Sequence, residues 1–133
     1  MRARLPSDVL QRRLVLVAED DEDIRALITH GLLRCGFEVV AARNGAEALR
    51  LAEERTPDLV ILDVRMPRID GLEVARRIRT NPGTAGVPVI LLTASVREVD
   101  VARGLEAGAD DYLQKPFSPQ ELGTRAQAIL SSK

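Results

Sequence analysis

The sequence lacks several features that would by themselves indicate a function. Its 133 residues include one cysteine, Cys35, so an internal disulfide and a cysteine metal pair are both excluded. His30 is the sole histidine, which argues against a histidine-based catalytic or metal site. No apolar run approaches the roughly 20 residues that a membrane-spanning helix needs. The basic residues 1–6 are not followed by an apolar segment, so we expect no signal peptide.

Charge of one sign is not in excess either. The chain has 19 basic and 20 acidic residues and a formal net charge of −1, so a basic surface for nucleic acid or anionic membranes is not expected. Apolar residues make up 45% and charged residues 29%, which is typical of a folded globular protein. We therefore expect an N-terminal leader over residues 1–13 and one domain over residues 14–131, with no direct binding to nucleic acid or membrane.

Apolar runs alternate with amphipathic segments along the chain. Short continuous apolar runs rich in β-branched residues are typical of strands buried on both faces, and apolar residues at helical spacing indicate helices. Strands are expected at 14–18, 37–42, 59–62, 87–92 and 111–114. Helices are expected after residue 23, around 46–52, around 72–78, over 99–107 and from residue 118 onward. This alternation predicts an α/β fold with five helices, a flavodoxin-like doubly wound five-stranded parallel sheet in the order 2-1-3-4-5.

Polar side chains follow four of these strands. Glu19 and Asp20 follow the first strand, Asp63 the third, Thr93 the fourth and Lys115 the fifth. Ligands of open α/β sheets bind outside these strand ends, and the first and third strands are neighbours, so the three carboxylates should converge. Two like charges about 4 Å apart repel by about 4 kcal/mol at an effective dielectric near 20, so the cluster needs a cation. Mg²⁺ suits it, because this ion takes one or two carboxylates together with water and phosphate oxygens.

The role of Asp63 depends on these neighbours. By itself, an aspartate at the end of a strand caps a loop as readily as it performs chemistry. A carboxylate beside a divalent metal, the Thr93 hydroxyl and the Lys115 ammonium has the groups needed for phosphoryl transfer, with the carboxylate as nucleophile. Only Lys115 and Lys133 are lysines among the 19 basic residues. A lysine inside a chain that otherwise uses arginine supports a positional need for a compact ammonium group.

Several short motifs resemble the receiver domain of bacterial two-component response regulators. In order they are Glu19-Asp20, Asp63 with Met66-Pro67 and Asp70-Gly71, Thr93-Ala94, and Lys115-Pro116-Phe117. The resemblance covers about residues 14–131. It implies that a histidine kinase phosphorylates Asp63 in a Mg²⁺-dependent reaction and that Thr93 and Lys115 contact the phosphoryl group. It also implies that Asp20, Asp63 and the Arg65 carbonyl bind Mg²⁺ directly, with Glu19 acting through water.

The resemblance further implies a conformational switch. Tyr112 would be the aromatic partner of Thr93, the Lys115–Pro116 bond would be cis, and Arg65 and Ser95 would set the lifetime of the phosphorylated state. Phosphorylation would change the face formed by the helix at 99–107, the strand at 111–114 and the last helix. Charges there resemble the pairs through which winged-helix-linked receivers form homodimers: Arg103, Glu106, Asp110, Asp111 and Arg125. Ordinary solvated surface charges are the alternative explanation for these five residues.

Two other functions remain open at this point. A pseudo-receiver would bind a partner without accepting phosphate, although the acids, Thr93 and Lys115 are all present. A phosphatase with an aspartyl nucleophile would need an acid two residues after Asp63, where Arg65 stands. A receiver would catalyse its own phosphorylation and dephosphorylation, but it is a cytoplasmic signalling switch rather than a turnover enzyme. No output domain is recognisable after the last helix, so a stand-alone regulator and a fragment both fit.

Overall fold

The structure is a computed structural model, and it describes residues 12–95 and 97–132. Residues 1–11, which make up most of the predicted leader, lie outside the described part. In the described part, no helix combines the length and apolar character needed to cross a membrane. The elements follow one another as β1 (Leu14–Ala18), α2 (Glu22–Arg34), β2 (Glu38–Ala42), α3 (Gly45–Arg55), β3 (Leu59–Asp63), α4 (Gly71–Thr80), β4 (Val89–Thr93), α5 (Glu98–Glu106), β5 (Asp111–Gln114) and α6 (Pro119–Ser131).

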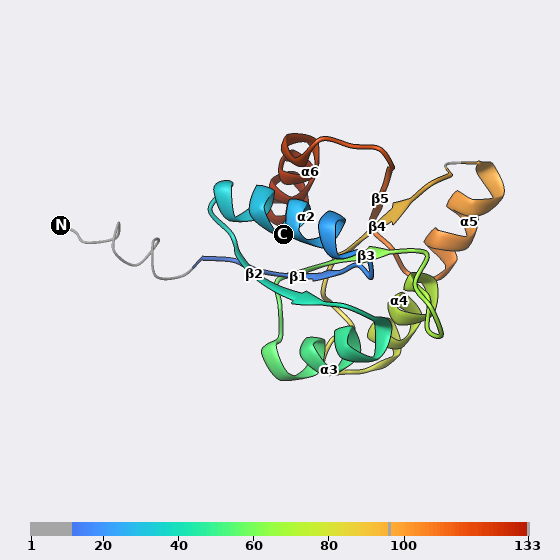
Figure 1. Cartoon of the computed structure of the whole chain (residues 1–133). Coiled ribbons are helices and arrows are strands. Elements are labelled where there is room, and N and C mark those ends of the chain that lie inside the picture. The colour runs from blue at the N-terminus through green and yellow to red at the C-terminus, as the bar shows by residue number, and fades with distance from the viewer. Residues whose placement is uncertain (1–11, 96, 133) are drawn as a thin grey trace.

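The strands form a single parallel sheet in the order β2-β1-β3-β4-β5, which confirms the predicted flavodoxin-like topology. In Figure 1, α2 and α6 cover one face of the sheet, and α3 and α4 cover the other. Side chains alternate between the two faces along each strand. Val17 and Ile61 pack with α2 and α6, whereas Leu16 and Leu62 pack with α3 and α4. All five residues of β3 are buried, as expected for a strand covered on both sides.

Two strands begin later than the sequence pattern predicts. β2 begins at Glu38 rather than residue 37, because the Phe37 N–H donates to the Leu32 carbonyl near the end of α2 at 3.2 Å rather than to the sheet. β4 begins at Val89 rather than residue 87. The Val87 N–H donates to the Thr84 carbonyl in the preceding turn, and Pro88 has no N–H for the sheet.

Side-chain caps fix where three helices leave the carboxyl edge of the sheet. The side chains of Asp21, Asp70 and Ser118 accept hydrogen bonds from main-chain N–H groups in the first turns of α2, α4 and α6. Asp70, predicted to lie in a turn, is therefore the N-cap of α4. These caps hold the loops that carry the polar residues following β1, β3 and β5.

Candidate functional site

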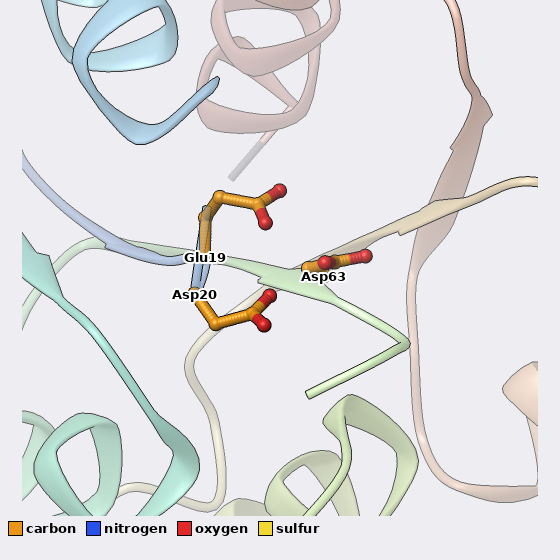
Figure 2. A group of neighbouring side chains, drawn as sticks. All are labelled: Glu19, Asp20 and Asp63. Carbon is orange, nitrogen blue, oxygen red and sulfur yellow. The ribbon is translucent and has the colours of Figure 1, made fainter. Parts of the chain in front are cut away.

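The carboxylates of Glu19, Asp20 and Asp63 meet at the carboxyl edge of the sheet. Glu19 and Asp20 directly follow β1, and Asp63 is the last residue of the neighbouring β3. One carboxylate oxygen from each lies within 4.8 Å of the others. Figure 2 shows the three side chains extending into the same space from adjacent strands. Glu19 and Asp63 are buried, and Asp20 is exposed, so the cluster is open to solvent on one side.

Lys115 provides the cation of this cluster. Its Nζ lies 3.1 Å from Asp63 Oδ1 and 3.2 Å from Glu19 Oε1. The Lys115 N–H donates to the Thr93 carbonyl at 2.7 Å, which ties the end of β5 to the end of β4. The Lys115–Pro116 bond is cis, as the resemblance implied. The structure therefore brings a buried aspartate and the lysine of the fifth strand into direct contact.

Burial and neighbouring charges shift two pKa values here. The pKa of Glu19 is raised to about 7, chiefly because burial disfavours the charged form. The Asp21 N–H and Lys115 oppose this rise, and Asp63 adds to it. Burial also acts to lower the pKa of Lys115, but the Asp63 and Glu19 carboxylates outweigh it and raise that pKa. One ammonium thus contacts two carboxyl groups, with that of Asp20 beside them, and the surplus of negative charge favours a divalent cation.

Thr93 and Tyr112 lie near one another on the two last strands. The Thr93 hydroxyl donates to the Ser95 carbonyl at 2.9 Å and accepts from the Ser95 N–H at 3.1 Å. Tyr112 pairs in register with Leu91 of β4, and its side chain is partly exposed. The Thr93 hydroxyl is therefore bonded to its own loop, close to the partner that the sequence analysis assigned to it.

A cleft of about 550 Å³ connects the acid cluster with the α5 side of the sheet. Asp20 and Arg65 line one part of it, and Thr93 and Tyr112 line another. Apolar side chains from the sheet, α4 and α5 complete the lining, among them Leu91, Leu72 and Leu105. The sequence did not predict this cleft, because its walls come from segments that are far apart in the chain.

The loop after Asp63 is held tightly against the start of α4. A side chain at Gly71 would collide with the Asp63 carbonyl, and the Gly71 N–H donates to the Val64 carbonyl at 2.9 Å. The Arg65 N–H lies 3.3 Å from Asp63 Oδ1, while the Arg65 side chain is exposed at the cleft. Glycine is therefore required at residue 71 for the close approach that sets the position of Asp63.

Three of the five residues assigned to a candidate dimer face have partners within the chain. Asp110 accepts hydrogen bonds from Arg79 at 2.7 Å and from the Val89 N–H at 2.8 Å. Asp111 pairs with Arg125 at 3.0 Å. Arg103 and Glu106, the other two residues of this set, are exposed on α5.

Sequence reasoning missed one residue of the site, Arg25. Its Nη1 donates to the main-chain carbonyl of Glu19 at 3.0 Å. The signal that could have revealed it is its place in the first turns of α2, where a positive charge opposes the helix dipole. An arginine at such a position therefore suggests that its side chain binds a specific partner that offsets this unfavourable interaction.

Comparison with known proteins identifies the family to which this site belongs. The family model described as the response regulator receiver domain matches residues 15–127. The chain is 46% identical over 116 residues to the alkaline phosphatase synthesis transcriptional regulatory protein PhoP of Bacillus subtilis, covering 87% of this chain and 48% of that protein. It is 41% identical over 118 residues to the phosphate regulon transcriptional regulatory protein PhoB of Pseudomonas aeruginosa, covering 89% of this chain and 52% of that protein.

Solved structures agree with this assignment. The chemotaxis protein CheY4 of Vibrio cholerae superposes with a TM-score of 0.85 at 32% identity, covering 89% of this chain and 98% of that one. The receiver domain of the sensor histidine kinase PA1611 of Pseudomonas aeruginosa, which has a magnesium ion coordinated in its active-site cleft, gives a TM-score of 0.83 at 33% identity, covering 90% and 98%. The chain spans about half the length of the regulators PhoP and PhoB. It belongs to the family of response regulator receiver domains of two-component systems.

Proposed function

We propose that Asp63 accepts a phosphoryl group from a histidine kinase in the cytoplasm, in a Mg²⁺-dependent reaction carried out by the domain at residues 14–131. The observation that carries this proposal is the buried Asp63 carboxylate, 5% exposed, with the Lys115 ammonium 3.1 Å from one of its oxygens. A buried carboxylate held beside a single cation is suited to nucleophilic attack and to charge neutralisation after it.

The donor set fits Mg²⁺. This hard cation prefers carboxylate and carbonyl oxygens and keeps several waters, and the carboxylates of Glu19, Asp20 and Asp63 lie within 4.8 Å of one another. Asp20 and Asp63 would bind the ion directly with the Arg65 carbonyl, and Glu19 would act through water. The bound ion would neutralise charge on the phosphoryl oxygens. The structure of the PA1611 receiver domain, with its coordinated magnesium, supports this assignment.

The side chains divide the work of phosphoryl transfer. An Asp63 oxygen attacks the phosphorus of a phosphohistidine, a P–O bond forms, and the P–N bond to the imidazole breaks. The Lys115 ammonium neutralises the transferred oxygens, because it already lies beside the attacking carboxylate. Thr93 supplies its hydroxyl to one of those oxygens once it leaves the Ser95 carbonyl that it now contacts.

The same movement would operate a switch. Thr93 and Tyr112 line one cleft, so withdrawal of the Thr93 side chain toward the phosphoryl group makes room for Tyr112 to move inward. The outer face formed by α5, β5 and α6 would then change and regulate a partner, an output domain or a homodimer. Arg65 and Ser95, which flank the site, would set the lifetime of the phosphorylated state.

Phosphorylation from a small donor tests the proposal. Acetyl phosphate with Mg²⁺ should add one phosphate to the wild-type chain by intact mass, and the Asp63→Asn variant should gain none. The Asp23→Asn variant is a matched control, because Asp23 is exposed on α2 outside the acid cluster and should be phosphorylated as in the wild type. A wild-type chain that gains no phosphate, or a gain that survives Asp63→Asn, would contradict the proposal and favour a phosphorylation-independent pseudo-receiver.

A further inference from the structure

We propose that Arg25 is a positioning residue of the metal site, which fixes the main chain that carries Glu19 and Asp20. Its guanidinium Nη1 donates to the Glu19 carbonyl at 3.0 Å, between the end of β1 and the start of α2. This inference rests on the proposed Mg²⁺ site. It adds to that site a residue that contacts neither the ion nor the phosphoryl group.

Arg25 holds the β1–α2 turn at two points. Its side chain bonds the Glu19 carbonyl, and its main-chain N–H donates to the Asp21 carbonyl at 2.9 Å. The Glu19 N–H is bonded to the Ala42 carbonyl of β2 at 3.1 Å, and Glu19 Oε2 accepts from the Asp21 N–H at the same distance. The peptide between Glu19 and Asp20 is therefore fixed on both sides, and both carboxylates are aimed at Asp63 (Figure 2).

The electrostatic setting of Arg25 supports this role. A positive charge near a helix N-terminus is unfavourable, so α2 gains nothing from an arginine there. Among the residues that the structure describes, no carboxylate oxygen lies within 4.0 Å of the Arg25 guanidinium, so an ion pair does not account for the residue either. Its guanidinium instead bonds the main-chain carbonyl of Glu19, in the loop that carries two of the three clustered acids.

Metal affinity is the property that this arrangement controls. Mg²⁺ demands nearly ideal octahedral geometry, so small displacements of its ligands are costly. Partners that orient the ligands typically contribute about 10-fold to 100-fold in affinity. If Arg25 is lost, the Glu19 carbonyl loses a charged donor, and the turn can rotate away from the geometry that the ion needs.

Calorimetric titration with MgCl₂ tests the inference. We expect Arg25→Met, which keeps the aliphatic stem but removes the donors and the charge, to raise the Mg²⁺ dissociation constant by about 10-fold. Arg25→Lys keeps a cationic donor and should restore part of the affinity. Arg34→Met is the matched control, because Arg34 is exposed at the far end of the same helix. The Mg²⁺ dissociation constant of this variant should equal that of the wild type.

Two measurements separate positioning from simple stability. Urea unfolding without Mg²⁺ identifies conditions in which each variant is fully folded, and titration under those conditions is insensitive to a loss of stability alone. If the wild type binds Mg²⁺ and both Arg25→Met and Arg25→Lys bind it with the wild-type dissociation constant, the role of Arg25 is refuted while the proposed function stands. If the wild-type chain binds no Mg²⁺, the proposed metal site is refuted, and this inference falls with it.

Discussion

The buried carboxyl of Glu19 should make the stability of the metal-free protein depend on pH. Its pKa in the folded chain is about 7, against 4.5 for an ordinary glutamate, mainly because of burial. The folded state therefore holds the proton more tightly than the unfolded state between these values. The contribution of the protonated Glu19 carboxyl to the free energy of unfolding is fully present below pH 4.5 and is lost as the pH rises through 7. Stability should consequently fall over this interval.

The size of the effect follows from the shift. Each pKa unit corresponds to about 1.4 kcal/mol, so the rise from 4.5 to about 7 gives a loss of about 3 kcal/mol across the interval. Glu19→Gln removes the titration and retains one of the two oxygens, which can accept from the Asp21 N–H as Glu19 Oε2 does. The raised pKa of Lys115 starts from 10.5, so its own titration lies above this interval. The difference between wild type and variant thus isolates the Glu19 proton.

Urea unfolding with a chelator at several pH values from about 4 to about 8 measures this difference. The free energy of unfolding of the wild type, relative to Glu19→Gln, should drop by about 3 kcal/mol from the acidic to the basic end. Glu38→Gln, an exposed substitution on β2, controls for a general effect of removing one carboxylate. If the wild-type and Glu19→Gln profiles run parallel, the carboxyl does not titrate near neutral pH and the electrostatic account of the site is wrong.

Three further predictions concern the free energy of unfolding, measured by urea titration of each variant and the wild type. Gly108→Ala should cost about 1–3 kcal/mol, because Gly108 has a φ of 99° and an added Cβ would lie 2.5 Å from the Arg79 Cγ. Arg79→Met should cost about 3 kcal/mol, mainly because it leaves three part-buried main-chain carbonyls without a donor, whereas loss of the exposed pair with Asp110 costs little. Ser118→Ala should cost about 1 kcal/mol, because α6 loses its N-cap hydrogen bond.

Each of these predictions has its own control. Gly36→Ala has a similar φ, 95°, but places a Cβ where no atom lies within 4 Å, so a loss as large as that of Gly108→Ala would show that the collision with Arg79 is irrelevant. Arg76→Met removes an exposed arginine from the same helix as Arg79. Equal losses of stability in Arg76→Met and Arg79→Met would contradict a special role for the main-chain carbonyls that Arg79 contacts. Ser131→Ala, at the opposite end of α6 from Ser118, should leave stability nearly unchanged.

Asp110 shows where sequence reasoning about a surface reaches its limit. The family resemblance placed it among the charges of a dimer face, and its side chain is exposed. The folded chain also brings the guanidinium of Arg79, 31 residues away, to 2.7 Å from the Asp110 carboxylate, which accepts a second hydrogen bond from the Val89 N–H at the start of β4. Long-range contacts of this kind depend on how α4 packs beside the loop before β5. No local pattern in the sequence carries that information.

The acid cluster was predictable for a physical reason. Parallel strands align their carboxyl ends at one edge of the sheet, so the residues after β1 and β3 had to meet once the strand order was known. Hydrophobic periodicity indicated the alternation of strands and helices, and the order 2-1-3-4-5 was then expected as the commonest arrangement of such a parallel sheet at this size. The family resemblance then assigned roles to Asp63, Thr93 and Lys115. Those assignments stay predictions until the phosphorylation and metal-binding experiments are done.

The sequence by itself therefore determined the class of fold, the order of the strands and the residue types gathered at one edge. Only the tertiary structure decided that Glu19 is buried with a pKa of about 7, that Lys115 contacts both Glu19 and Asp63, and that Arg25 donates to the Glu19 carbonyl. The physical reason is that the alternation of strands and helices follows from local periodicity and the strand order from general rules for parallel sheets, whereas burial, hydrogen-bond partners and pKa shifts depend on the distances between side chains from separate elements.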